Sequence, residues 1–174
     1  METEVIIALG SNMHDPQKNL LNALSRLVQP LSAKMQCSSL WRSDPQDMAE
    51  DAGFFLNAVV KGQTRLSPRG LLTALQTIES SMGRKTDHAY HDSRIIDLDI
   101  ITYGNVFIDE LDLVIPHPRA HERKFVLLPL CELTPGFILP GQKLTVEELE
   151  NSARAMNINR LSPPPVLPAP SPTL

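Results

Sequence analysis

Two aspartates separated by one residue are the strongest chemical signal in this sequence. Asp97 and Asp99 lie within Ile95–Ile101, where paired isoleucines favour a β-strand. Because side chains alternate across a strand, both carboxylates point to one face, about 7 Å apart. Two like charges on one face repel, and one or two hard divalent cations such as Mg²⁺ would compensate them. A solvated strand face without a ligand is the alternative.

Charged and polar side chains flank this predicted strand. Arg94 directly precedes it, and Arg84 follows the preceding helical stretch. Guanidinium groups near paired carboxylates suit a phosphate chain held between Mg²⁺ and arginine, whereas loop arginines on a solvated surface are the alternative. Gln76 and Glu79 are three residues apart, so they share a helix face that could look towards the same loop or lie exposed.

The histidines do not form a zinc motif. Four of the five fall in one region but lack a Cys or acidic partner at ligand spacing: His88, His91, His117 and His121. His117 stands between two prolines, where its imidazole could donate to a phosphate. Gly10-Ser11-Asn12 lacks the Gly-Lys-Ser/Thr ending of a P-loop. The pattern therefore favours a carboxylate–arginine site over a zinc site.

Composition narrows the class of protein. The chain has 174 residues, a net charge of −4 and an isoelectric point near 5.7, which argues against nonspecific nucleic-acid binding. Cys37 and Cys131 lack CxxC or metal-ligand spacing, so we expect buried structural thiols. The acidic start carries no signal-peptide pattern, and no apolar run approaches the ~20 residues of a membrane span. We expect a soluble, cytoplasmic protein that does not bind membranes.

Helical periodicity and capping signals predict three helices and a partly helical segment. Asp15-Pro16 opens a helix that stops before Pro30, and Ser67-Pro68 opens one that ends at Met82 with Gly83 as its C′ residue. The remaining predicted stretches are 119–133, interrupted at Pro129, and a helix from the capping box Thr145–Glu148 to about Met156.

Apolar runs and alternation predict the strands. The predicted strands are Val5–Leu9, 33–42 with Met35, Cys37, Ser39 and Trp41 on one face, Phe54–Gln63, Ile95–Tyr103, Val106–Ile108 after a Gly104-Asn105 turn, and Phe137–Leu139. Helices separated by pairs of strands predict an α+β fold. We expect a ferredoxin-like sandwich, with a mostly antiparallel sheet flanked by helices.

Proline usage divides the chain. Six of the 15 prolines fall between Pro163 and Pro172. We therefore expect a folded domain over 1–161 and a Pro-rich tail over 162–174, disordered or polyproline-II-like. An inert tail is the simplest interpretation, and a docking strip or a fusion-linker remnant is the alternative.

Several short motifs occur in an order and at separations that resemble one enzyme family. They are Leu9–Asn12, Phe55–Val59, Gln76–Arg84, Arg94–Ile100 and Pro116–Arg119. Each motif is weak alone, but together they resemble 6-hydroxymethyl-7,8-dihydropterin pyrophosphokinases of folate biosynthesis over residues 4–157. The resemblance implies transfer of an intact pyrophosphoryl group from ATP to the pterin hydroxymethyl group, which releases AMP.

The resemblance also implies roles for the phosphate-side residues. Asp97 and Asp99 match the family's ligands for two Mg²⁺ ions, and Asp97 would accept the proton of the substrate hydroxyl. Arg84 and Arg94 match catalytic cations of a mobile loop. Further ATP-binding positions are implied for Gln76, Glu79, Ile100, His117 and Arg123.

On the pterin side, the resemblance implies that the Asn57 amide pairs with the edge of the ring. Phe55 and Phe125 would sandwich the ring, and backbone near Ser43, Asp44 and Gln46 would complete the pocket. We expect a monomer whose partners are ATP and the reduced pterin. The alternatives are a noncatalytic nucleotide-binding module, against which the complete set of site residues argues, and an RNA-binding ferredoxin-like domain, against which acidity and sparse strand aromatics argue.

Overall fold

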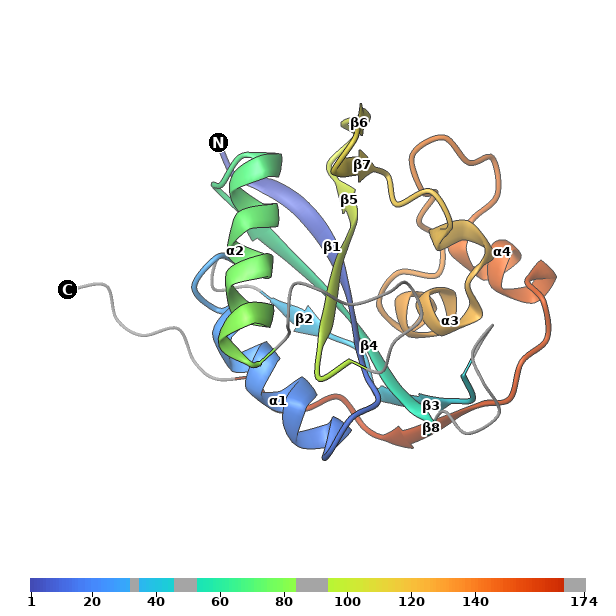
Figure 1. Ribbon diagram of the computed structural model, residues 1–174. Helices are drawn as coiled ribbons and strands as arrows, with labels where there is room; N and C mark the ends of the chain where they lie inside the picture. Colours follow the sequence, from blue (N-terminus) through green and yellow to red (C-terminus); the bar gives the residue numbers. More distant parts are fainter. Residues whose placement is uncertain (32–34, 46–52, 84–93, 168–174) are drawn as a thin grey trace.

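The computed structural model describes residues 1–31, 35–45, 53–83 and 94–167 (Figure 1). In chain order its elements are β1 (Thr3–Ser11), α1 (Pro16–Leu27), β2 (Gln36–Cys37), β3 (Leu40–Ser43), β4 (Phe55–Thr64), α2 (Pro68–Ser81), β5 (Asp97–Tyr103), β6 (Ile108–Glu110), β7 (Leu113–Ile115), a 3₁₀ turn (Ala120–Glu122), α3 (Lys124–Leu133), α4 (Val146–Ser152) and β8 (Ile158–Ser162).

The main sheet is antiparallel throughout its described pairings. Its strand order is β5-β1-β4-β3-β8, and β2 also pairs with β4. Helix α1 connects β1 to the β2–β3 segment, and α2 connects β4 to β5, so each crossover skips the strand between. This order is that of the ferredoxin-like sandwich, which confirms the predicted fold class.

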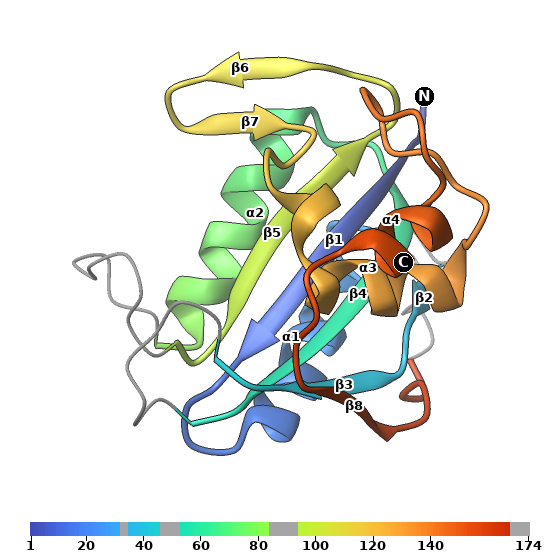
Figure 2. The same cartoon turned by 90° about the vertical axis from the view of Figure 1, so that its right-hand side faces the viewer.

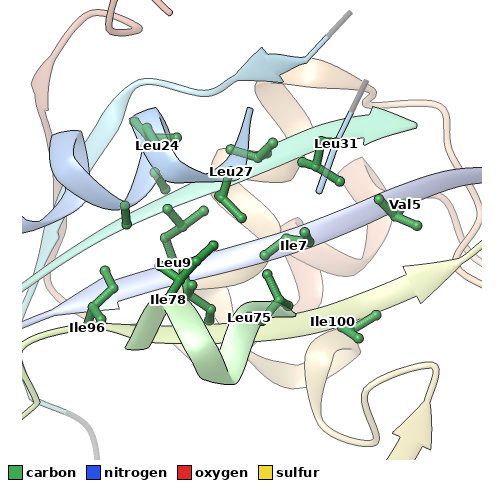
Figure 3. Close-up of a cluster of buried hydrophobic side chains, with 14 of the residues drawn as sticks. Val5, Ile7, Leu9, Leu24, Leu27, Leu31, Leu75, Ile78, Ile96 and Ile100 are labelled. Atoms are coloured by element: carbon green, nitrogen blue, oxygen red, sulfur yellow. The ribbon is translucent and has the colours of Figure 1, made fainter. Parts of the chain in front are cut away.

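Helices cover both faces of the sheet. Figure 1 shows α1 and α2 on one face and α3 and α4 on the other. Because side chains alternate along β1, this strand contributes to two hydrophobic cores. Val5, Ile7 and Leu9 pack under α1 and α2 in the first core, and Ile6 packs under α3 and α4 in the second core. Figure 3 shows the first core, where leucines of α1 and α2 meet these β1 side chains.

The predicted helix starts are confirmed. Asp15 accepts a hydrogen bond from the Lys18 backbone N–H at 3.0 Å, and Ser67 caps α2 in the same way. Gly83 adopts a φ of 96°, the left-handed conformation that a helix C′ position favours. The capping box at Thr145 is also present, although α4 ends at Ser152 rather than near Met156.

The prediction of one continuous strand over 33–42 was wrong. Cys37 pairs with Val60, whereas Trp41 pairs with Asn57, so residues 38–40 lie opposite only 58 and 59. The extra residue is a β-bulge that separates β2 from β3. Cys37 consequently faces the first core. Trp41 lies on the opposite face of the sheet, although the two residues were predicted to share one face.

The chain after β5 also differs from the prediction. A turn does form at Gly104, but the chain does not return along β5, and β6 pairs with β7 instead. The predicted strand Phe137–Leu139 is reduced to a single bridge between Ile138 and Thr145. Pro129 lies inside α3 without ending the helix.

Strand β8 was not among the predicted strands, and it adds to the edge of the sheet beside β3 (Figure 1). This strand includes Ser162, and Leu167 packs against the first core, so the described chain keeps contact with the domain beyond 161. Residues 168–174 of the predicted disordered tail lie outside the part of the chain that the structure describes. Cys37 is buried as expected and Cys131 only partly so. Within the described ranges, no helix is long and apolar enough to cross a membrane.

Candidate active site

Three of the predicted site residues, Asn57, Asp97 and Asp99, lie at one end of the sheet face that carries α3 and α4. Gly10, near the end of β1, is paired with Asn57 of β4 on one side and with Asp97 of β5 on the other. Figure 2 looks onto this face, and α3 and α4 do not lie over the arrowhead end of β1. Two polar side chains, one on each side of a glycine, therefore lie where the helical layer ends.

The two aspartates share a face, as their alternation predicts. Leu98 and Ile100 pack into the first core, so Asp97 and Asp99 point to the opposite side of β5. Arg94 Nη1 donates to Asp97 Oδ2 at 2.6 Å. Burial, followed by the charge of Asp97, raises the pKa of Asp99 to about 7.

This aspartate pair is chemically suited to Mg²⁺. Hard carboxylate oxygens are its preferred protein ligands, and Mg²⁺ commonly combines one or two of them with substrate phosphates and water. The repulsion that raises the pKa of Asp99 would be relieved by a divalent cation beside Asp97. In the part of the chain that the structure describes, no cluster of three or more His, Cys, Asp or Glu residues offers an all-protein cage.

Gln76 and Glu79 are neighbours on the surface of α2, as their spacing predicts, but they differ in burial. Glu79 is only 6% exposed, and its Oε1 accepts the Leu98 backbone N–H at 2.8 Å. This bond ties α2 to the strand between the two aspartates. Gln76 lies on the exposed side of α2. Glu79 thus supports the aspartate strand from beneath, and Gln76 is separate from it.

His117 is fixed beside β5 by its backbone. It follows a cis Ile115–Pro116 bond, and its N–H donates to the Ile101 carbonyl at 2.9 Å. Its Nδ1 accepts the Arg119 backbone N–H at 3.2 Å, which assigns the proton of the neutral ring to Nε2. Burial, then the nearby Arg123 charge, lowers the pKa of His117 to about 4. The ring is therefore a neutral donor near pH 7.

Asn57 is the buried polar residue on the other side of Gly10. It is 5% exposed, and its Nδ2 donates to Ser43 Oγ at 2.9 Å and to the Trp41 carbonyl at 3.4 Å. Its Oδ1 lies 3.8 Å from the position that a Cβ on Gly10 would take. The amide orientation is thus set by β3, and its oxygen faces the space above Gly10.

Phe55 lies two residues before Asn57 on β4, on the same face of the strand. Phe55 begins β4 opposite Ser43, and Phe125 lies in the first turn of α3 with the Arg123 guanidinium 5.6 Å from its ring centroid. The backbone N–H of Asp44 donates to the carbonyl of Asn157, the residue before β8, at 3.1 Å, and this bond holds the start of the loop that follows β3.

Besides Gln76, three sequence-predicted site residues do not join this arrangement through a described side chain. The side chain of Ile100 is buried in the first core, on the far side of the sheet from Asp99. Arg84 and Gln46 lie outside the described residues.

Two residues without a predicted role connect the strands at this end. Asn12 donates from its backbone N–H to the Arg94 carbonyl, and its Oδ1 accepts the Arg94 N–H at 2.7 Å. Ser11 Oγ donates to the Ile95 carbonyl at 2.5 Å. The contacts of Ser11 and Asn12 fix Arg94 next to Asp97. The sequence signal that could have identified these two residues is their position directly after a buried strand.

The chain matches a protein-family model described as 7,8-dihydro-6-hydroxymethylpterin-pyrophosphokinase (HPPK) over residues 6–135. It is 38% identical over 148 residues to a 2-amino-4-hydroxy-6-hydroxymethyldihydropteridine pyrophosphokinase of Haemophilus influenzae, covering 84% of this chain and 91% of that protein. It is also 38% identical over 162 residues to the folic acid synthesis protein FOL1 of Dictyostelium discoideum, covering 92% of this chain but 24% of that protein.

A solved HPPK-DHPS structure from Plasmodium falciparum has a TM-score of 0.71 at 16% identity, covering 87% of this chain and 45% of that one. This likeness supports the fold alone. The chain therefore spans about a quarter of FOL1 and less than half of the HPPK-DHPS chain, but nearly the whole bacterial enzyme. The match to the family model over most of the domain shows that the chain belongs to the 7,8-dihydro-6-hydroxymethylpterin-pyrophosphokinase family.

Proposed function

We propose that this protein transfers the pyrophosphoryl group of ATP to the hydroxymethyl group of 6-hydroxymethyl-7,8-dihydropterin, in folate biosynthesis. The observation that carries the proposal is the row Asn57–Gly10–Asp97, which sets a buried amide and a carboxylate on opposite sides of a glycine. In this reaction the hydroxymethyl oxygen attacks the β-phosphorus, the bond to the α–β bridging oxygen breaks, and AMP leaves.

Asp97 and Asp99 would hold two Mg²⁺ ions along the ATP phosphates. When bound, the metal neutralises phosphate charge and orients the entering and leaving oxygens. Asp97 also accepts the proton of the substrate hydroxyl. Arg94 is already bonded to Asp97, so it is held where it can contact a phosphate as that proton moves.

The remaining phosphate contacts come from the segment between β7 and α3. Neutral His117 offers Nε2–H as a donor, and Arg123 adds a positive charge next to it. Arg84, Gln76, Glu79 and backbone at Ile100 are the further positions proposed for ATP.

The pterin occupies the Asn57 side. Because Asn57 Nδ2 is committed to Ser43 and Trp41, its Oδ1 is the group that accepts a hydrogen bond from a pterin N–H. Phe55 and Phe125 would supply the two ring faces of an aromatic sandwich around the pterin. Backbone of Ser43, Asp44 and Gln46 completes the pocket.

One assay tests the proposal. The protein is incubated with ATP, Mg²⁺ and the reduced pterin, and nucleotide products are separated. AMP in a 1:1 ratio to pterin diphosphate is the expected result, and EDTA should abolish it. ADP would indicate an ordinary kinase. Nucleotide binding without any turnover would favour the regulatory-module alternative and reject the proposal.

The domain limits, the monomeric state and the cytoplasmic location are further parts of the proposal. The match of nearly the full length of bacterial relatives supports a self-sufficient catalytic unit over 1–161. Because Leu167 packs against the first core, two truncations are informative. If a chain ending at Leu161 keeps the activity of one ending at Leu167, the domain boundary at 161 stands. If only the shorter chain loses activity, the domain extends beyond Leu161.

A further inference from the structure

A β-bulge in the sheet sets the orientation of the residues that hold Asn57. Between β2 and β3, the Ser38 side chain takes the place of a backbone acceptor, because its Oγ accepts the Val59 backbone N–H at 2.9 Å. The same Oγ donates to the Ser39 carbonyl at 2.9 Å. The Ser38 N–H still donates to the Val59 carbonyl. The next backbone N–H, that of Ser39, takes its partner from outside the sheet.

That partner is Glu132, near the end of α3. Its Oε2 accepts the Ser39 N–H at 2.7 Å and the Trp41 Nε1–H at 3.3 Å. Ser39 is fully buried, and a buried backbone N–H without a partner is costly. A single carboxylate, 24% exposed as a side chain, therefore satisfies the bulge and anchors the indole that follows it.

Arg160 of β8 balances this carboxylate. Its Nε donates to Ser39 Oγ at 2.7 Å and lies 3.5 Å from Glu132 Oε1. The bulge is thus held from the helical layer by Glu132 and from the edge of the sheet by Arg160. Neither residue belongs to the candidate active site.

The bulge decides which way β3 faces. Because side chains alternate, one residue more or less in this segment would turn Trp41 and Ser43 to the opposite face of the sheet. In the observed register, Ser43 Oγ and the Trp41 carbonyl both accept from Asn57 Nδ2. We infer that Glu132 is a positioning residue for the pterin side of the site, because it holds the bulge that orients β3 towards Asn57. This inference rests on the proposed function.

The test separates pterin binding from the phosphate chemistry. In Glu132→Ala, we expect the KM for the pterin to rise about tenfold, equivalent to roughly 1.4 kcal/mol, while the KM for ATP and kcat stay within about twofold of wild type. Glu132→Gln keeps an acceptor oxygen for the Ser39 N–H and should recover most of the loss. A selective effect with recovery by glutamine is not expected of general destabilisation.

Trp41 provides a measurement independent of turnover, because it is the only tryptophan in the chain. Quenching of its emission by the pterin, without ATP, should give a dissociation constant about tenfold weaker in Glu132→Ala and close to wild type in Glu132→Gln. The emission maximum of Glu132→Ala should also move to longer wavelength, because the indole N–H then bonds water.

Two control variants calibrate these results. Leu149→Ala opens a cavity in the second core and destabilises the protein without touching the bulge, and Glu147→Ala removes an exposed carboxylate from α4. Both should retain the wild-type KM for the pterin. The inference is overturned if Glu132→Ala leaves pterin affinity unchanged, or if Leu149→Ala weakens it equally. If the wild-type protein binds the pterin but shows no turnover, the proposed function is rejected. The fluorescence measurement of pterin binding then still decides the role of Glu132.

Discussion

Filling the space above Gly10 should raise the stability of the protein while it destroys activity. Adjacent strands lie about 4.8 Å apart, so Asn57 and Asp97 are separated by roughly 10 Å with Gly10 between them. Among the residues that the structure describes, a Cβ on Gly10 would meet only Asn57 Oδ1, at 3.8 Å, which is ordinary contact. Gly10→Ala should therefore stabilise the fold by about 0.4–1 kcal/mol, through the lower entropy of the unfolded chain.

A leucine at the same position adds three more carbons to this space. Since misplacing a substrate by about 1 Å can cost 100-fold in rate, we expect Gly10→Leu to lower kcat/KM for the pterin by about 100-fold or more. Urea unfolding and the AMP-release assay, run on one preparation, measure both effects. Folded Gly10→Leu protein with wild-type activity would refute the location of the site.

Gly62 is the matched control, because it also lies in a central strand but at the other end of the sheet. A Cβ there would lie 3.2 Å from Leu31 Cδ1 in the first core. Crowding of this kind costs about 1–3 kcal/mol. Gly62→Ala should thus lose stability and keep its activity, the reverse of the pattern at Gly10.

Three further predictions follow from the described contacts. Asp97→Ala and Asp99→Ala should each abolish most AMP release, and retained turnover would contradict the metal role. The melting temperature of Asp99→Ala should stay at or above that of wild type, because this variant removes a buried carboxylate that Asp97 repels. Burial, reinforced by the charge of Glu132, raises the pKa of the Cys37 thiol from 9.0 to about 12. The folded state therefore holds this proton more tightly, so the free energy of unfolding should fall as the pH rises from about 9 towards 12, and Cys37→Ala should flatten that part of a urea-unfolding profile. Thr145→Ala removes the N-cap of α4 and should cost about 1 kcal/mol in the same measurement, with unchanged activity.

Features that depend on neighbouring residues in the chain were predictable. The helix starts at Asp15 and Ser67 follow from a capping side chain and a proline at the next position, both within one turn. The shared face of Asp97 and Asp99 follows from strand alternation alone. In each case the sequence contains both partners of the interaction within four residues.

Features that depend on distant partners were not predictable in this way. The break after Cys37 requires Glu132, which is 93 residues from the Ser39 N–H that it accepts. Strand β8 has exposed side chains at most positions, so it lacks the alternation that identifies a strand, and its pairing with β3 supplies the missing information. Backbone pairing between remote segments leaves no local signal of its own.

The edge of β5 illustrates the same point for the turn at Gly104. The turn signal was correct, yet a hairpin back along β5 would have occupied the edge where the His117 N–H now bonds the Ile101 carbonyl. That edge instead receives the segment after β7, which brings His117 beside the aspartate strand. The competing partner lies beyond the next two strands, so a turn motif cannot reveal it.

The site itself combines both kinds of information. On the face under α3 and α4, successive β1 residues shrink from Ile6 to Ala8 to Gly10 as the helical layer ends, which is visible in the sequence. The residues paired with Gly10 are polar because the register brings Asn57 and Asp97 there from segments 40 residues apart. A register shift of one residue between β1 and β4 would replace Asn57 with Leu56 or Ala58 and turn the amide to the first core. The chemistry is therefore encoded in residue types, but its assembly depends on the sheet register that the bulge and the central pairings maintain.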